Sequence, residues 1–267
     1  MPAHRISLAS ILMCCLTCTG CFNADPAKKL TSMPQGTGFV LRSVKNDTGN
    51  HKYSIFIPRD YNASRKYPTV VFLHGIGEAG SDGKKCTTVG IGPAIAKRNG
   101  EFPFIVLFPQ AGWDWTTDNA GKLAIDVLKD AEKDYAIDTD RVTLTGMSSG
   151  GKGTWVLGAR YAETWNALVP MGGYAAADTV PTLVKTKMPI WALHNSGDFI
   201  VPVGGTKSMI KKLEAAGGHP KVTIYSASGH NCWDAAYDSG ELFAWLQQQR
   251  RSQRSSVSSA MSSAMSR

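Results

Sequence analysis

A serine between two glycines is the first residue whose surroundings indicate chemistry. Gly146, Ser148 and Gly150 form the pattern Gly-x-Ser-x-Gly directly after the short apolar run 141–145. The residues that follow have helical spacing, so we expect the serine at a sharp turn between a strand and a helix. Such a turn exposes the serine hydroxyl, and the amide of Ser149 would face a developing oxyanion. The pattern predicts a nucleophile, but because glycine and serine are common in turns it needs support elsewhere in the chain.

The same glycines also fit the beginning of a phosphate-binding loop. Residues 146–152 read Gly-x-x-x-x-Gly-Lys. The next residue is Gly153, where a phosphate loop needs a serine or threonine hydroxyl for Mg²⁺. A nucleotide-binding site is therefore the weaker interpretation.

A serine nucleophile needs a base, and His230 is the best-placed histidine. A neutral hydroxyl is a poor nucleophile until a base within hydrogen-bond reach removes its proton. His230 lies in a Gly-His-Asn-Cys-Trp loop after the last predicted strand, which agrees with the chain order Ser, acid, His. His74 and His194 directly end strands, where an imidazole ring more often braces a loop. We expect His230 to act as the base.

The acid that orients this base is expected between the serine and the histidine. Asp198 follows the penultimate predicted strand in the sequence Gly-Asp-Phe-Ile-Val-Pro. Asp178 is the alternative, but it lies in a loop after an earlier strand, and either residue could simply form a turn. We expect Asp198 to hold the histidine in the correct tautomer and to stabilise the imidazolium.

A second oxyanion donor besides Ser149 is expected in the sequence His74–Gly75–Ile76, which follows the third predicted strand. The backbone N–H of Ile76 would be this donor, although a merely glycine-rich loop would look the same.

Strands that alternate with helical segments must position these residues. Eight apolar runs read as strands, at 39–44, 53–58, 67–73, 104–108, 141–145, 167–171, 190–193 and 222–225. This alternation predicts an α/β fold, a mainly parallel sheet of about eight strands with helices on both faces. Each candidate residue lies just past the carboxyl end of a strand, where such sheets bind ligands.

Composition excludes several other functions. The formal net charge is +8, but five arginines lie in the first five and the last eighteen residues, and the remainder carries only +3. No basic stripe remains, so we expect no nucleic-acid partner. No cluster has the spacing of metal ligands, and we expect neither a metal nor a cofactor.

Both ends of the chain differ from its middle. His4 and Arg5 precede a short apolar run, and residues 19–21 resemble the end of a bacterial lipoprotein signal, with Cys21 as the lipidated residue. We therefore expect a signal peptide at 1–21, a tether at 22–37, one catalytic domain at 38–249 and a disordered, Ser- and Arg-rich tail at 250–267. The mature protein would be exported, as a lipoprotein of the bacterial cell envelope attached to the membrane or as a secreted or periplasmic protein.

Taken together, residues 38–249 resemble the α/β-hydrolase superfamily. Within it they are similar to secreted bacterial phospholipase/carboxylesterase-type serine esterases, including polyhydroxybutyrate-depolymerase-like and feruloyl-esterase-like proteins. The segments that carry the resemblance are 72–78, 138–142, 146–151 with Trp155, 189–194, 197–198 with 201–202, and 229–230 with Trp233. The resemblance implies Ser148, Asp198 and His230 as a catalytic triad and Ile76 and Ser149 as oxyanion donors. Many relatives carry Met or Gln where this chain has Ser149, but only the backbone N–H is needed there.

The predicted substrate is a carboxylic ester. Between Gly173 and Pro189 the chain has no room for a large cap domain, so we expect an open site. Aromatic residues in loops at the catalytic face could bind a sugar or an aryl group, or simply cover the rim of the core: Trp113, Trp115, Tyr174, Phe199 and Trp233. We expect aryl, acetyl or polymer-linked esters. A prolyl-oligopeptidase-like serine peptidase is the alternative, and a non-catalytic binding protein agrees less well with a complete triad.

Only two cysteines lie beyond the leader. Cys86 follows the expected oxyanion loop and Cys232 lies two residues after His230, so both should sit at the same face of the domain. We expect a disulfide between them in an exported protein.

Overall fold

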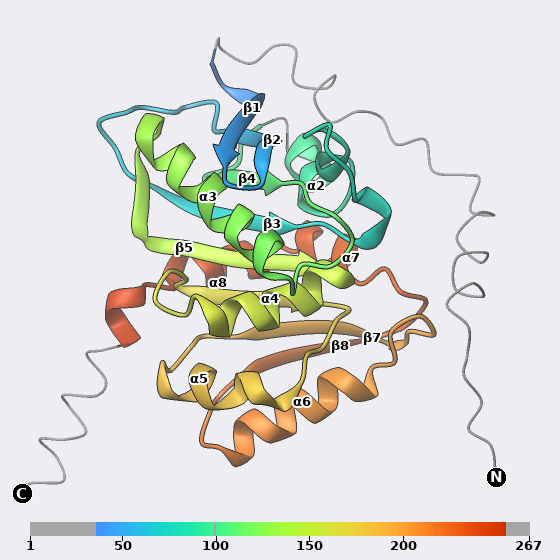
Figure 1. The fold of residues 1–267 in the computed structure, drawn as a ribbon. Coiled ribbons are helices and arrows are strands. Elements are labelled where there is room, and N and C mark those ends of the chain that lie inside the picture. Colours follow the sequence, from blue (N-terminus) through green and yellow to red (C-terminus); the bar gives the residue numbers. More distant parts are fainter. Residues whose placement is uncertain (1–35, 99, 255–267) are drawn as a thin grey trace, which may run out of the picture.

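An eight-stranded sheet forms the centre of the protein. The computed structural model describes residues 36–98 and 100–254. The strands are β1 Gly38–Asn46, β2 Gly49–Ile57, β3 Tyr67–Leu73, β4 Ile105–Pro109, β5 Ile137–Met147, β6 Ala167–Met171, β7 Trp191–Gly197 and β8 Lys221–Ser228. Their order in the sheet is β1-β2-β4-β3-β5-β6-β7-β8, with the β1–β2 hairpin at one end and β8 at the other (Figure 1). Only the β1–β2 and β2–β4 pairs are antiparallel, which confirms the predicted α/β class.

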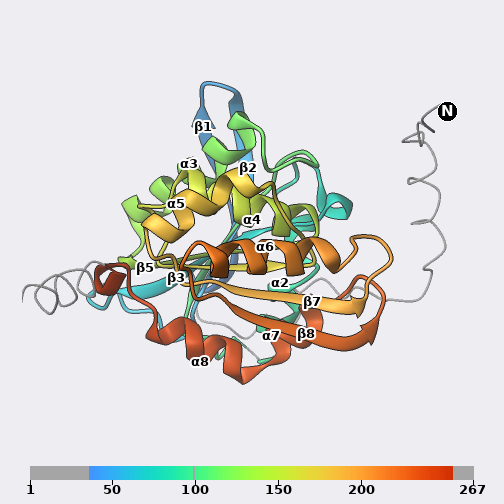
Figure 2. The same ribbon diagram turned by 90° about the horizontal axis from the view of Figure 1, so that it is seen from below.

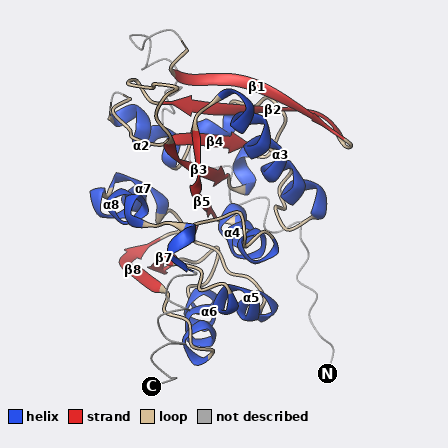
Figure 3. Ribbon diagram, turned by 90° about the vertical axis from the view of Figure 1, so that its left-hand side faces the viewer, coloured by secondary structure: helices blue, strands red, loops and turns tan. Residues whose placement is uncertain are grey.

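Helices cover both faces of this sheet. The helices are α2 Ile91–Lys97, α3 Asp118–Asp134, α4 Ser149–Arg160, α5 Val180–Lys185, α6 Gly204–Ala215, α7 Trp233–Asp238 and α8 Gly240–Gln248. The single-turn helices η2 Ile76–Glu78, η3 Lys85–Thr87 and η4 Ala177–Thr179 lie in loops. One face carries α3, α4, α5 and α6, and the other carries α2, α7 and α8 (Figure 3). Figure 2 shows the sheet between α5 and α6 on one side and α7 and α8 on the other.

Each face of the sheet has its own hydrophobic core, and β3 shows why. Val71 and Leu73 pack in one core cluster, while Val70 and Phe72 pack in the other. Because successive side chains of a strand point to opposite faces, a strand covered on both sides must be apolar throughout. The continuous apolar run in the sequence therefore marks a central strand.

No cap domain covers the sheet's carboxyl edge between β6 and β7. Residues 172–190, all of them described, hold only η4 and α5. This connection leaves the loops after the strands at the surface of the domain.

The ends of the chain are only partly described. The predicted signal peptide with Cys21 lies outside the described residues, as do most of the tether and residues 255–267. Residues 251–254 of the expected tail are helical, and Arg254 donates to the carbonyls of Ala162 and Thr186, so ordered structure continues beyond the predicted boundary at 249. Among the described helices, none has the length and apolar character needed to span a bilayer.

Candidate active site

The turn at Ser148 joins β5 to α4 in a strained backbone conformation. Ser148 has φ 55° and ψ −118°, in a region that non-glycine residues rarely adopt. A Cβ added at Gly146 would lie 2.4 Å from the Gly150 carbonyl oxygen, and one added at Gly150 would lie 2.0 Å from the Leu73 oxygen. Both glycines are therefore required by close backbone contacts, as the motif predicts.

The structure brings Ser148, His230 and Asp198 into one hydrogen-bonded chain. The Nε2 atom of His230 is 2.8 Å from the Ser148 Oγ, and its Nδ1 is 2.6 Å from the Asp198 Oδ2. Since a carboxylate only accepts, Nδ1 carries the proton and Nε2 is free to accept from the serine hydroxyl. This is the arrangement in which an imidazole can remove the serine proton while a carboxylate holds the ring. Asp178, the alternative acid, lies exposed in η4.

Asp198 remains an anion although it is buried. Burial by itself would raise the pKa of its carboxyl group, but the hydrogen bond from His230 and the amides of Val201 and Ile200 together outweigh burial and lower the pKa. Both amides donate to Oδ1 at 2.9 Å. The acid is thus charged and fixed in position before any substrate binds.

The loop that carries His230 is held from both sides. The side-chain amide of Asn195 donates to the carbonyls of Gly229, at 3.0 Å, and of Asn231, at 3.1 Å. The ring of Trp233 packs perpendicular to the imidazole, with 5.1 Å between the ring centroids. These contacts fix the position of the imidazole above the serine.

The amides of Ile76 and Ser149 are the first N–H groups of η2 and α4. A helix offers no acceptor to its first amides, so both are available to an oxyanion. A Cβ added at Gly75 would lie 3.6 Å from the Ser148 Cβ, which shows that this loop approaches the serine closely. The side-chain Oγ of Ser149 is buried and has no hydrogen-bond partner among the described residues.

Sequence reasoning missed a second histidine on the catalytic acid. His194 is fully buried, and its Nε2 lies 3.1 Å from the Asp198 Oδ2 and 2.8 Å from the Val201 carbonyl oxygen. Both neighbours are acceptors, so Nε2 carries a proton and donates it to them. Its Nδ1 lies 2.8 Å from the hydroxyl of Thr206. The sequence feature that could have indicated this contact is the four-residue spacing between His194 and Asp198. The sequence alone does not show whether a histidine at this spacing bonds to the acid or only supports a loop.

Replacing His194 should weaken the triad without removing any of its members. We expect His194→Phe to lower kcat about tenfold to a hundredfold, because a hydrogen bond to a charged group is worth about 1.5–3 kcal/mol. The fall of kcat/KM on the acid side of its pH profile should begin at higher pH. Without the donor from His194, the Asp198 carboxylate interacts more strongly with the protonated ring of His230. His194→Gln, which can keep an N–H donor, should recover part of kcat. An unchanged pH profile in His194→Phe would contradict this role.

His74 holds the oxyanion loop, the segment that carries the Ile76 amide, in position through hydrogen bonds. It is fully buried, its Nδ1 donates to the Gly75 carbonyl at 2.7 Å, and its Nε2 accepts from the Ala111 amide at 3.2 Å. The Nε1 of Trp115 also donates to the His74 carbonyl, at 3.0 Å. Burial lowers the pKa of His74 to about 4, so the ring is neutral and the Nε2 acceptor persists.

This low pKa predicts a loss of stability in acid. Between about pH 6.5 and about pH 4 the unfolded chain binds a proton that the folded His74 does not, so stability falls as the pH falls. The loss should reach about 3 kcal/mol near pH 4, since one pKa unit is worth about 1.4 kcal/mol. We expect urea unfolding of His74→Asn to show a correspondingly smaller decrease over this range. An equal decrease in both proteins would contradict the prediction.

The five predicted aromatic contacts occupy different environments. Trp115 is a correction: it is fully buried, packs edge-on against His74 and belongs to the core, so it cannot contact a substrate. Trp233 is half-buried against His230. Tyr174 is 42% exposed and Phe199, next to Asp198, is 74% exposed. Trp113 is 62% exposed and lines a separate cavity.

The predicted disulfide is wrong, because Cys86 and Cys232 are both free, buried thiols. The Sγ of Cys86 donates to the Phe108 carbonyl at the end of β4, and that of Cys232 donates to the Leu193 carbonyl in β7. β4 and β7 are four positions apart in the sheet, so these carbonyls are roughly 19 Å apart. A disulfide requires Cα atoms within about 7 Å. Both cysteines do lie on the same face of the sheet, but at different ends of its core cluster.

Residues 109–241 match the model of the dienelactone hydrolase family. A solved structure of a thermostable esterase is similar with 29% identity and a TM-score of 0.70, over 79% of this chain and 63% of its own. The chain has the α/β-hydrolase fold. This chain covers somewhat less than two thirds of the length of that esterase.

Two further solved structures share this fold. A feruloyl esterase module from Clostridium thermocellum complexed with sinapinate has 17% identity and a TM-score of 0.61, over 79% of this chain and 87% of its own. FphF, a fluorophosphonate-binding serine hydrolase from Staphylococcus aureus, has 14% identity and a TM-score of 0.63, over 79% of this chain and 99% of its own. Among curated proteins, none matches the sequence. The family model and the thermostable esterase are thus proteins to which this chain is similar.

Metal ligands are not gathered at the site. Within the described part of the chain, no group of three or more His, Cys, Asp or Glu residues could hold a metal ion. The chemistry available to the described residues is nucleophilic attack by a serine, assisted by an imidazole, with two amides facing the charge that forms.

Proposed function

We propose that this protein cleaves carboxylic esters in two steps through an acyl-enzyme on Ser148. The observation that carries the proposal is the hydrogen-bonded chain from the Ser148 hydroxyl through His230 to Asp198. This chain supplies a nucleophile, a base and an orienting acid at the carboxyl edge of one sheet. The strained turn at Ser148 and the free first amides of η2 and α4 support the same reaction.

In the first step the Ser148 Oγ attacks the ester carbonyl carbon while the His230 Nε2 takes the hydroxyl proton. The carbonyl oxygen becomes an oxyanion that accepts from the amides of Ile76 and Ser149, each worth about 3 kcal/mol of the barrier. His230 then returns the proton to the departing alcohol oxygen, and the serine keeps the acyl group. In the second step the His230 Nε2 removes a proton from water, and the hydroxide oxygen attacks the acyl carbon. The bond between this carbon and the Ser148 Oγ then breaks, the carboxylic acid leaves, and His230 returns the proton to the serine oxygen.

We propose aryl, acetyl or polymer-linked esters as the substrates. The exposed rings of Tyr174 and Phe199 and the absence of a cap between β6 and β7 support an open site that accepts part of a large molecule. The structural similarity to a feruloyl esterase module supports the fold only, and it motivates ferulate as the aryl acid to test. A serine peptidase on this fold is the competing function.

A labelling experiment followed by a substrate panel tests this function. A fluorophosphonate probe should label wild-type protein on Ser148, which peptide mass spectrometry would identify. Wild-type protein should then hydrolyse p-nitrophenyl acetate and methyl ferulate, and should leave a panel of peptide amides intact. Labelling at another serine, or turnover of peptides without turnover of esters, would contradict the proposal.

We propose that the mature protein is exported and attached to the membrane through a lipid on Cys21. The support is the leader sequence, which lies outside the described residues. Mass spectrometry of protein purified from the cell envelope should find Cys21 as the first residue, carrying acyl chains. A mature protein that keeps residues 1–20, or one released without lipid, would contradict the anchor and leave the esterase proposal unaffected.

A further inference from the structure

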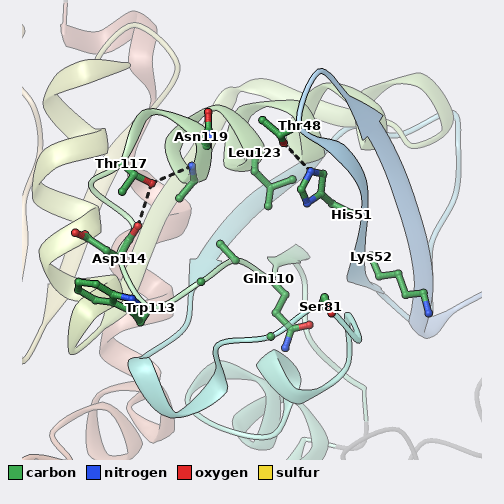
Figure 4. A pocket seen from close by; sticks show the side chains of 14 residues that line it. Thr48, His51, Lys52, Ser81, Gln110, Trp113, Asp114, Thr117, Asn119 and Leu123 are labelled. Carbon is green, nitrogen blue, oxygen red and sulfur yellow. Dashed lines mark hydrogen bonds between the residues drawn. The ribbon is translucent and has the colours of Figure 1, made fainter. Parts of the chain in front are cut away.

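A cavity of about 350 Å³ lies beside the oxyanion loop (Figure 4). The start of β2, the segment after β4 and the first turn of α3 line it. β2 runs antiparallel to β4, with Tyr53 opposite Pro109, so its start lies at the carboxyl edge of the parallel strands. β4 is two positions from β5 in the sheet, which places the cavity's near side roughly 10 Å from the strand that carries Ser148.

The floor of this cavity is bonded to the oxyanion loop. The side-chain amide of Gln110 donates to the Glu78 carbonyl at 3.0 Å and accepts from the Gly83 amide at 2.6 Å. The Gly80 amide donates to the Ala111 carbonyl at 3.1 Å. These bonds occupy the polar atoms of Gln110, so it shapes the floor, and the position of the cavity relative to the oxyanion donors is fixed.

Three polar side chains around the cavity have no partner among the described residues. Lys52, Ser81 and Asn119 are exposed, and within the described part of the chain no side-chain hydrogen bond or ion pair engages them. Figure 4 shows Trp113 and Lys52 at opposite ends of the hollow, with Asn119 and Ser81 on either side of it. Trp113 is 62% exposed, and two residues along the chain Trp115 packs against α4. Trp113 therefore lies at the end of the cavity nearest the catalytic serine.

The chemistry of this lining fits a molecule with many hydroxyl groups. An amide, a hydroxyl and an ammonium group can each bond to hydroxyl oxygens, and the exposed indole offers an apolar face. Lys52 and the carboxylate of Asp114 put both signs of charge at the cavity, so it does not select an anion or a cation. Its volume is within the range of small-molecule sites, about 300–1,000 Å³.

We propose that this cavity is a subsite for a neutral sugar unit in the alcohol part of the ester, separate from the bond that is cleaved. The proposal rests on the proposed esterase function, because the sugar would reach the cavity while its ester lies at Ser148. A sugar chain leaving the ester would pass over η2 and stack on Trp113 before its hydroxyls reach Asn119 and Ser81. The cavity would then raise the affinity for sugar-linked esters and leave small esters unaffected.

Two measurements test the subsite. Xylotriose, which carries no ester, should bind the full-length Ser148→Ala protein in a titration followed by NMR, and adding Trp113→Ala or Asn119→Ala should weaken it about fivefold to tenfold. In active protein, Trp113→Ala should lower kcat/KM for a feruloyl ester of xylotriose about fivefold to tenfold. This loss should come from a higher KM, with kcat unchanged. Its kcat/KM for methyl ferulate should be unchanged. Trp113→Phe should retain most of the binding, and Val222→Ala, an exposed apolar residue in β8, is the matched control.

The outcomes separate this inference from the proposed function. If wild-type protein hydrolyses methyl ferulate but Ser148→Ala binds no xylotriose at millimolar concentration, the subsite is wrong and the esterase stands. If xylotriose binds and Trp113→Ala and Val222→Ala behave alike, the sugar lies elsewhere and the subsite is equally wrong. If neither ester is cleaved while xylotriose binds in a Trp113-dependent way, the cavity binds sugars and the proposed function fails.

Discussion

Ser148→Ala should lose about 10⁵-fold to 10⁶-fold of the wild-type kcat on p-nitrophenyl acetate, while the protein stays folded. Removal of the Oγ leaves no nucleophile for the acyl-enzyme, and the oxyanion amides and substrate binding alone leave an acceleration of only about 10³-fold to 10⁴-fold over water. The side chain makes one hydrogen bond, to His230, so its loss should change the core little. Retained hydrolysis in pure variant protein would overturn the assignment of the nucleophile.

A second substitution at this position separates chemistry from backbone strain. Ser148 has φ 55°, which glycine adopts without steric cost. Ser148→Gly should therefore be as inactive as Ser148→Ala but more stable than Ser148→Ala by about 1 kcal/mol in urea unfolding. Equal stability of the two variants would show that the turn stores no strain that glycine relieves.

Asp198→Asn should lower kcat about 10⁴-fold with little change in KM. Both carboxylate oxygens of Asp198 face pairs of N–H donors, two backbone amides at Oδ1 and two histidines at Oδ2. An asparagine has a single acceptor oxygen, so its NH2 group must face one of these donor pairs. An amide nitrogen in place of Oδ2 would favour the His230 tautomer with its proton on Nε2, where it cannot accept from the serine. The loss should be largest at neutral pH.

Asp178→Asn is the matched control for this experiment. Asp178 lies between the serine and the histidine in the chain, as Asp198 does, but it is exposed in η4. Its replacement should leave kcat and KM at their wild-type values. A large loss in Asp178→Asn and a small one in Asp198→Asn would reverse the assignment of the acid.

The sequence by itself determined the fold class and the three residues of the hydrogen-bonded triad, for reasons that are local or topological. A strand buried on both faces must be almost entirely apolar, and the continuous apolar run 67–73 therefore predicts a central strand. The close backbone contacts at Gly146 and Gly150 exclude side chains, so the motif around Ser148 had to contain glycine. Parallel strands end at one edge, and therefore Ser148, Asp198 and His230 meet although they are far apart in the chain.

Only the tertiary structure decided which loop side chains face solvent and which thiols meet. Trp113 and Trp115 cannot be distinguished by residue type or position in the sequence, but Trp113 is exposed and Trp115 is buried against His74. Cys86 and Cys232 lie after strands that share an edge, but strand order in the sheet separates them. The second hydrogen bond of His194 to the acid likewise depends on how the loop after β7 folds back. These properties depend on distances between segments remote in sequence, and residue type and spacing do not encode such distances.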